Sequence, residues 1–151
     1  MFYSAEDYKE IIYDNYSNPR NKCLSKDKDY CTCEMKNPSC GDELVVQVKK
    51  HGDTIEDCRH NGHGCSICCA SASIMSELVQ GKSEAEANHL CDEFMSMVSG
   101  GEYDEELLDE AAAFKGVAQL PARIKCATLC WKGMHRLLDE LDKDEGENSG
   151  K

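Results

Sequence analysis

The stretch that organises the chain is residues 61–72, with the sequence Asn-Gly-His-Gly-Cys-Ser-Ile-Cys-Cys-Ala-Ser-Ala. Its two glycines indicate a loop, and a helical pattern begins directly after Cys65. Unpaired backbone N–H groups and the helix dipole favour negative charge at a helix N-terminus. Because cysteine binds metal or attacks sulfur as the thiolate, this position favours chemistry at Cys65.

Composition limits the class of protein. With 151 residues and a net charge of −12, we expect one domain and no nucleic-acid partner, since phosphate contacts need clustered lysine and arginine. An acidic surface instead suits partners that offer basic patches. We find no signal sequence and no apolar run of about 18 residues, so no membrane contact is expected. The 11 cysteines then indicate a reducing, cytoplasmic setting, where cysteines more often bind metal or carry redox chemistry than form disulfides.

Hydrophobic periodicity predicts an α+β fold in which helices pack on one face of a three-stranded antiparallel sheet. A capping sequence at Ser4 opens a helix that ends before Asn18-Pro19. Alternating residues predict strands near 30–36, 44–49 and 54–61, and helical spacing follows at 65–80, 84–97, 103–114 and from Pro121 onward. We assign residues 1–142 to one domain and residues 143–151 to a flexible acidic tail.

Three cysteines in distant segments stand out as candidate metal ligands. Cys40 and Cys65 are flanked by glycine, which lets the backbone approach an ion closely. Cys126 lies near the start of the last helix, beside Arg123 and a lysine that would stabilise a thiolate. Asp42 would supply an oxygen ligand from the loop of Cys40. We predict that these three thiolates and one carboxylate meet around one ion, a donor set that suits tetrahedral zinc.

The four ligand candidates, and the remaining cysteines and histidines, also have a simpler interpretation. A buried cysteine more often packs as a small core residue, and an aspartate in a turn more often caps it. Cys65 and Cys68 have the spacing of a thioredoxin-like pair, but no βαβ pattern surrounds them. The histidines expected to be solvated are His60, His63 and His135.

The cysteine segments resemble iron–sulfur assembly proteins of the IscU/SufU group. The matching motifs are Asn-Pro-x-Cys-Gly-Asp at 37–42, Gly-x-Gly-Cys-x-Ile at 62–67, Ala-Ser-x-Ser at 70–73 and Arg-x-Lys-Cys-Ala-x-Leu-x-Trp at 123–131. Asn-Pro-Arg-Asn at 18–21 resembles the N-terminal signature of the group. The SufU type is the closer match, because Lys125 stands where the IscU type usually has histidine and residues 99–113 resemble the SufU insertion.

The resemblance implies an IscU/SufU-like fold and zinc held by Cys40, Asp42, Cys65 and Cys126. It also implies a sulfur-acceptor role beside a pyridoxal-phosphate cysteine desulfurase of the SufS type, with downstream iron–sulfur assembly proteins as further partners. A histidine of the desulfurase would take a place on zinc and release Cys40 to accept persulfide sulfur, and Arg123 would position or activate that thiol. The cysteines that depart from the family pattern are Cys31, Cys33, Cys68, Cys69 and Cys130.

Two other functions stay open at this point. One is a scaffold on which a [2Fe–2S] cluster is assembled at the same ligands, and the other is a zinc-stabilised interaction module without sulfur chemistry. Lys125 and the insertion favour sulfur transfer over the scaffold. The glycine beside Cys40 permits mobility and disfavours the module, because structural zinc sites prefer closed thiolate pairs. Whether the protein is an enzyme or a co-substrate and activator of the desulfurase is also open.

Overall fold

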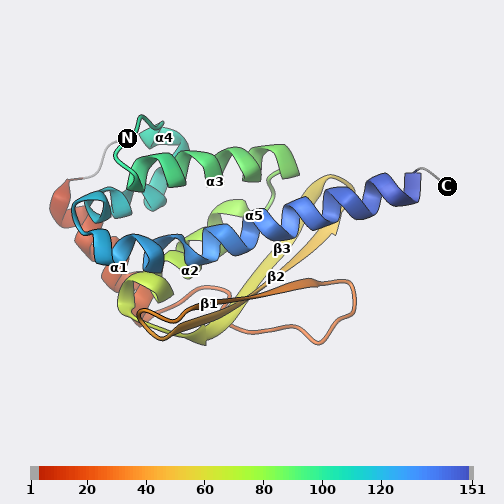
Figure 1. Ribbon diagram of the computed structural model, residues 1–151, viewed down its shortest axis with the longest axis horizontal. Coiled ribbons are helices and arrows are strands. Elements are labelled where there is room, and N and C mark those ends of the chain that lie inside the picture. Colours follow the sequence, from red (N-terminus) through yellow and green to blue (C-terminus); the bar gives the residue numbers. More distant parts are fainter. Residues whose placement is uncertain (1–3, 150–151) are drawn as a thin grey trace.

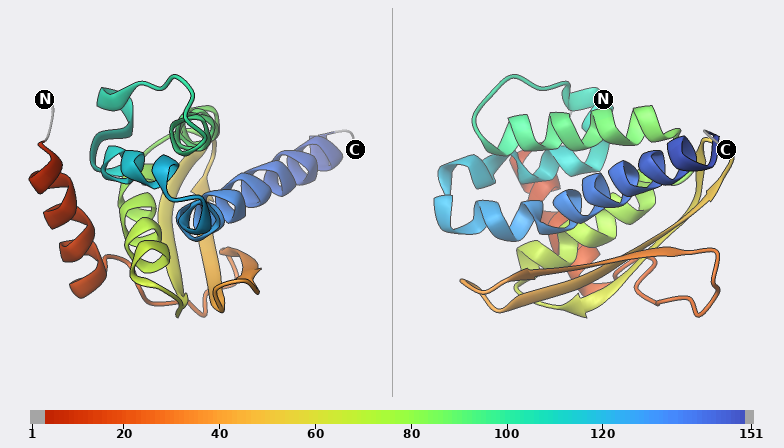
Figure 2. Two further views of the ribbon diagram at one scale, coloured as in Figure 1. Left: turned by 60° about the vertical axis from the view of Figure 1, so that its left-hand side comes forward. Right: turned by 45° about the vertical axis from the view of Figure 1, so that its right-hand side comes forward.

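The computed structural model describes residues 4–149, with side chains as far as residue 141. It is an α+β fold in which the helices lie on one face of a three-stranded antiparallel sheet, as predicted (Figures 1 and 2). The elements follow in the order α1 (Ala5–Ser17), β1 (Cys31–Asn37), β2 (Asp42–His51), β3 (Thr54–His63), α2 (Ser66–Val79), α3 (Glu84–Val98), α4 (Glu105–Leu108), the 3-10 helix η1 (Asp109–Gln119) and α5 (Pro121–Ser149).

The sheet is a meander in the order β1-β2-β3 with antiparallel pairing throughout. Cys33 pairs with Val46, and Val46 pairs with His60 on the other side. The side chains of Leu44, Val46 and Val48 alternate along β2 and are buried against the helices. The sheet therefore places the turn between β1 and β2 and the end of β3 at the same end of the molecule.

The helix boundaries follow local signals in the sequence. Ser4 and Ser83 each form a capping box, with Asp7 and Glu86 respectively, at the starts of α1 and α3. After α2, Gly81 adopts a φ of +82°, the left-handed conformation in which glycine commonly terminates helices. These interactions confirm the predicted ends of α1, α2 and α3.

One predicted helix is wrong. Residues 103–114 were expected to form one α-helix, but α4 has only 4 residues and is followed by 11 residues of 3-10 helix. Ala112 and Ala113 are buried in this segment, and the other buried apolar residues, Leu108, Ala111, Phe114 and Val117, recur every third position. That spacing aligns them on one face of a helix with about three residues per turn, whereas an α-helix would spread them around its axis. Asp109, with a φ of +49°, marks the change between the two helix types.

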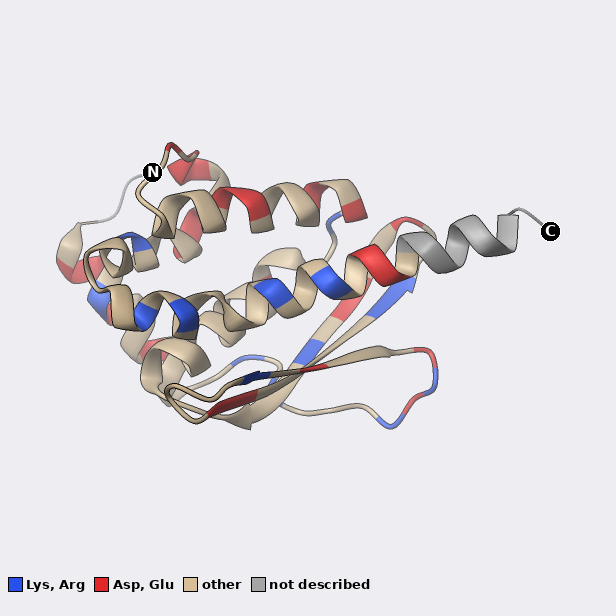
Figure 3. Ribbon diagram, in the orientation of Figure 1, with Lys and Arg blue, Asp and Glu red and all other residues tan. Residues whose placement is uncertain are grey.

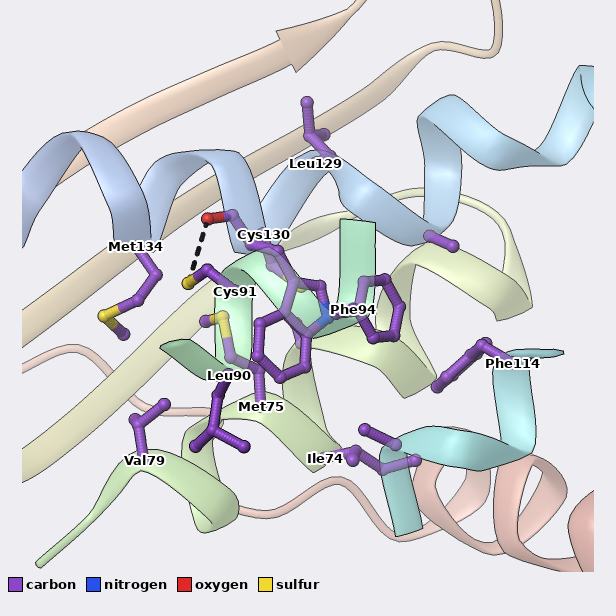
Figure 4. Close-up of a cluster of buried hydrophobic side chains, with 14 of the residues drawn as sticks. Ile74, Met75, Val79, Leu90, Cys91, Phe94, Phe114, Leu129, Cys130 and Met134 are labelled. Carbon is purple, nitrogen blue, oxygen red and sulfur yellow. Dashed lines mark hydrogen bonds between the residues drawn. The ribbon is translucent and has the colours of Figure 1, made fainter. Parts of the chain in front are cut away.

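The core joins α3, η1 and α5 over the sheet (Figure 4). The ring of Phe94 stacks on Trp131 with 4.5 Å between centroids, and Phe114 meets Phe94 edge-on at 5.9 Å. Burial and ring packing of this kind contribute roughly 2 kcal/mol or more per aromatic side chain. The stacked pair fixes the long helix α5 against α3 and so fixes the place where α5 begins.

The predicted acidic tail, residues 143–151, lies mostly outside what the structure describes. The backbone of α5 is helical to Ser149, but the side chains from residue 142 and all of residues 150 and 151 lie outside the described residues. The flexible tail and the domain boundary at 142 therefore stay predictions. None of the helices within residues 4–149 combines the length and the apolar character that crossing a bilayer requires.

Candidate metal centre

The predicted ligands converge at the end of the sheet where β1 turns into β2. A sulfur of Cys40, a carboxylate oxygen of Asp42 and the sulfur of Cys126 all lie within 4.8 Å of one another. The turn between β1 and β2 provides the first two groups, and the second turn of α5 provides the third. The part of the chain that the structure describes holds no other group of three such donors this close together.

Cys65 borders this group and completes it from the side of α2. It is the N-cap residue of α2, as predicted, and its backbone N–H donates a 3.0 Å hydrogen bond to Oδ1 of Asp42. The sulfur of Cys65 is not within the 4.8 Å group, although its side chain is close enough to raise the pKa of the Cys126 thiol. The structure therefore brings all four predicted residues to one place, with candidate donor atoms of three of them within 4.8 Å of one another.

Asp42 is buried at the centre of the site and is hydrogen-bonded to two of the surrounding residues. Only 1% of its surface is exposed, although a buried carboxylate needs partners to offset its desolvation. Besides the bond from Cys65, its Oδ2 accepts a hydrogen bond of 3.3 Å from Nδ2 of Asn37. The same Nδ2 lies 3.9 Å from the sulfur of Cys126. Asn37 thus fixes the position of the Asp42 carboxylate relative to the Cys126 thiol. The sequence did not predict this positioning role.

Two glycines allow the loop before α2 to approach Asp42 closely. A Cβ atom on Gly64 would lie 2.5 Å from Oδ1 of Asp42. A Cβ atom on Gly62 would lie 2.0 Å from the carbonyl oxygen of Glu43, and Gly62 also has a φ of +140°. Any side chain at either position would push Cys65 away from the carboxylate. The glycines therefore allow the close approach of this loop to Asp42 and Glu43, while the approach of the backbone to an ion stays a prediction.

Helix α5 contributes Cys126 and Arg123 to the site. Cys126 is fully buried, and its burial, together with hydrogen bonds to Asp42, Cys40 and Cys65, raises the pKa of its thiol. Arg123 is exposed and makes a hydrogen bond to Cys126, which with the nearby thiols of Cys65 and Cys40 raises the pKa of the guanidinium. Four groups that are anionic when deprotonated converge here, with the guanidinium of Arg123 beside them. Such a cluster is stabilised by a bound divalent cation.

Cys40 differs from the other members of the site because its side chain is exposed. It lies in a turn of the chain next to Gly41, whose φ of +71° is in the left-handed region. Asp42 and Cys126 form the buried side of the site, while the Cys40 thiol is exposed to solvent. A reactant carried by another molecule can therefore reach Cys40 first.

The other thiols and histidines do not join the site. Cys68 is fully buried, so its predicted spacing with Cys65 does not form an accessible pair. Cys69 is half-buried, with its sulfur 3.7 Å from the carbonyl oxygen of Gly64. His60 is not solvated as expected: it is buried, and its Nε2 lies 2.7 Å from the carbonyl oxygen of Arg20. His63 and His135 are exposed, as expected.

Comparison with known proteins gives consistent matches over most of the chain. Residues 7–127 match the model of the NifU-like N-terminal domain. A Bacillus subtilis protein, the zinc-dependent sulfurtransferase SufU, is 42% identical over 142 residues that cover 93% of each chain. An iron–sulfur cluster assembly scaffold protein, IscU of Streptococcus pyogenes, is 45% identical over 102 residues, or 67% of this chain and 64% of that protein.

A solved structure extends the match to three dimensions. The crystal structure of a proposed iron–sulfur cluster assembly scaffold protein for the SUF system, from Fervidobacterium islandicum, superposes with a TM-score of 0.76. The two sequences are 33% identical, and the alignment covers 90% of this chain and 96% of that one.

Proposed function

From the premise that the chain belongs to the family of NifU-like N-terminal domains, we propose that it is a zinc-dependent sulfur acceptor. In this proposal it takes persulfide sulfur from a cytoplasmic cysteine desulfurase of the SufS type and passes it to downstream iron–sulfur assembly proteins. The observation that carries the proposal is the exposed thiol of Cys40, which lies against two buried ligand groups, Asp42 and Cys126. The relatedness to the Bacillus subtilis zinc-dependent sulfurtransferase supports it.

The donor set fits zinc. Three thiolates and one carboxylate provide the four ligands of a tetrahedral site, and Cys40, Asp42 and Cys126 already lie within 4.8 Å of one another. Cys65 would provide the fourth donor from the N-terminus of α2. When bound, zinc keeps its thiol ligands deprotonated without adding redox chemistry.

Cys40 would perform the transfer by thiol–persulfide exchange. Its thiolate attacks the outer sulfur of the persulfide on the donor cysteine, a new S–S bond forms on Cys40, and the donor cysteine leaves as a thiolate. Sulfur and charge balance, so the step needs no oxidant. Arg123, which is exposed beside the three thiols, is placed to stabilise the anionic sulfur on Cys40 during the exchange.

The alternative is a scaffold on which a [2Fe–2S] cluster is assembled at the same residues. The identity to the Streptococcus pyogenes scaffold protein favours it, because thiolates also hold iron–sulfur clusters. Two features favour sulfur transfer. Lys125, which is exposed, stands where the IscU type usually has histidine, and residues 99–113, which resemble the SufU insertion, contain α4 and the first part of η1.

A desulfurase assay tests the proposal. The rate of sulfur release from free cysteine is measured for a SufS-type desulfurase alone, with this protein, and with this protein after chelation of its metal. Sulfur transfer predicts stimulation that chelation abolishes, together with a mass increase of one sulfur atom on Cys40. A desulfurase rate unaffected by the protein would contradict sulfur transfer, and stoichiometric iron and labile sulfide on the purified protein would favour the scaffold.

A further inference from the structure

The exposed side of α5 is basic although the chain as a whole carries a charge of −12. Residues 120–138 contain four Lys or Arg residues and no Asp or Glu, and all four cations are exposed. Figure 3 shows basic segments along the first part of α5, and acidic segments on α3, α4 and other elements. Lys125, Lys132 and Arg136 lie within about 40° of one another around the axis of α5, whereas Arg123 lies on a different side of its first turn. We call these three residues, Lys125, Lys132 and Arg136, the α5 basic strip.

Among the side chains described in residues 4–141, no Asp or Glu oxygen lies within 4.0 Å of a cation of the α5 basic strip. Some cations elsewhere are neutralised locally, as in the pairs Arg59–Asp57 at 2.8 Å and Lys115–Glu105 at 3.1 Å. Unpaired charges of one sign project their field into solvent and attract a surface of opposite sign. The acidic composition predicted partners with basic patches. The α5 basic strip beside the site would instead attract an acidic surface of a partner.

The strip begins at the site and extends away from it. Lys125 is next to Cys126 in the sequence, and Nη1 of Arg136 lies 3.7 Å from the sulfur of Met35, so the far end lies over β1. The 11 residue steps between Lys125 and Arg136 span roughly 17 Å of helix. This length suits a protein surface and exceeds what a single small anion would occupy. Leu120 is 54% exposed just before the start of α5 and offers an apolar contact at the site end of such an interface.

We propose that the α5 basic strip docks an acidic surface of the sulfur-donating protein, next to the cysteine that carries its persulfide. This inference rests on the proposed function, because the donor must bring its persulfide to Cys40 and therefore must face the start of α5. Attraction between the two surfaces accelerates encounter and orients the donor cysteine toward the exposed thiol. Cys40, Leu120 and the strip then form one continuous docking face.

Other occupants fit the charges less well. A nucleic acid would meet the acidic residues between 102 and 110 on the neighbouring segment as well as the net charge of −12. A second copy of this chain would place its acidic segment on the strip and form a head-to-tail contact. Both are decided by the experiment below.

The experiment measures binding of a purified SufS-type desulfurase from the same organism at about 50 mM and about 500 mM salt. The test variant is Lys132→Glu/Arg136→Glu, which leaves the site residues intact. The matched control is Lys26→Glu/Lys28→Glu, which makes the same charge change at exposed positions before β1, at the opposite end of that strand from Cys40. Circular dichroism checks that the double charge reversal leaves the protein folded. If it does not, the milder variant Lys132→Gln/Arg136→Gln removes the two charges without reversing them.

We expect the test variant to weaken binding about tenfold or more at low salt and the control to change it less than about threefold. At high salt the variants should converge, and sulfur transfer at saturating desulfurase should stay at the unmodified rate while the KM for the donor rises. Equal binding by the test variant and the unmodified protein, an equal loss in the control, or no binding of the desulfurase at all would overturn the inference. So would displacement of the desulfurase by duplex DNA, or strip-dependent self-association in light scattering. Strip-dependent binding without sulfur uptake would instead remove the proposed function and leave the docking surface.

Discussion

The cysteines of the candidate metal centre and those of the core, exemplified by Cys40 and Cys130, show how the surroundings of a thiol determine its chemistry. Cys40 lies exposed in a turn beside a carboxylate and a second thiol. Cys130 lies fully buried in the core, where its sulfur donates a 3.4 Å hydrogen bond to Oγ of Ser71. Burial raises the pKa of Cys130 to about 12, so this thiol stays protonated at neutral pH. The site thiol can therefore act as a ligand or nucleophile, while the core thiol serves packing.

The core group also positions the site. Oγ of Ser71 on α2 donates a 2.7 Å hydrogen bond to the carbonyl oxygen of Ala127 and accepts a 3.0 Å bond from Nε1 of Trp131 on α5. These bonds hold the first halves of α2 and α5 together. Cys65 and Cys126 lie at the starts of these two helices, so the polar contacts around Cys130 set the spacing of two ligands.

The largest expected effect separates Cys40 from Cys126. Cys40→Ala should abolish sulfur acceptance and cost less stability than Cys126→Ala, because each change removes a ligand but only Cys126 is also a buried side chain. The loss of buried contacts should make Cys126→Ala the costlier change by about 2 kcal/mol or more. Persulfide mapping by mass spectrometry and thermal melts measure the two quantities. Equal stability losses, with sulfur uptake intact in the Cys40 variant, would remove the assignment of Cys40.

Chemical labelling of the native protein should sharpen the contrast. Iodoacetamide should modify the exposed Cys23, and also Cys40 once metal is chelated, because both side chains reach solvent. The buried thiols of Cys58, Cys91 and Cys130 should react at least about a hundredfold more slowly, since they require opening of the core. Peptide mapping over time gives the rates. Labelling of Cys130 as fast as Cys23 would show that the core is not closed.

Removal of Asn37 tests the support beneath the site. Asn37→Ala should lower zinc affinity about 10-fold to 100-fold, because the amide no longer holds Asp42 in place. Asn61→Ala, which removes an exposed amide near the same loop, is the matched control and should leave affinity unchanged. Competition with a chromophoric chelator measures both values. An Asn37 variant with the affinity of the control would deny it a positioning role.

The smallest expected effect is in the core. Cys130→Ala should lower the free energy of unfolding by about 1 to 2 kcal/mol at pH 7 and leave metal content unchanged. Above a pH of about 8.5 the unfolded state loses the thiol proton that the folded state retains, so the unmodified protein loses stability as pH rises toward 12. The variant lacks this loss, and its deficit should shrink at pH 10. Denaturant titrations at the two pH values test this, and a constant deficit would contradict the raised pKa.

The sequence predicted the features that depend on neighbours along the chain and missed those that depend on distant ones. The capping boxes and the glycine after α2 are local signals, and each was found. Part of the 3-10 pattern was present locally, because Leu108, Ala111, Phe114 and Val117 are three positions apart, but Ala112 and Ala113 obscure this spacing and the segment was interpreted with the α-helical period. Sequence position alone could not show that His60 would be covered by the carbonyl oxygen of Arg20, which lies 40 residues earlier.

The site shows the same division. The four candidate ligands were identifiable because glycine, basic residues and helix starts surround them in the sequence. Asn37 was not, because its role depends on Cys126, which lies 89 residues later. Only the packing of α5 against the sheet brings the two together.

X-ray absorption at the zinc edge of protein purified without oxygen tests the central claim most directly. The arrangement of Cys40, Asp42, Cys65 and Cys126 predicts one zinc per chain with three sulfur neighbours at about 2.3 Å and one oxygen at about 2.0 to 2.2 Å. A site with two or fewer sulfur neighbours, or a spectrum that Cys65→Ala leaves unchanged, would contradict it.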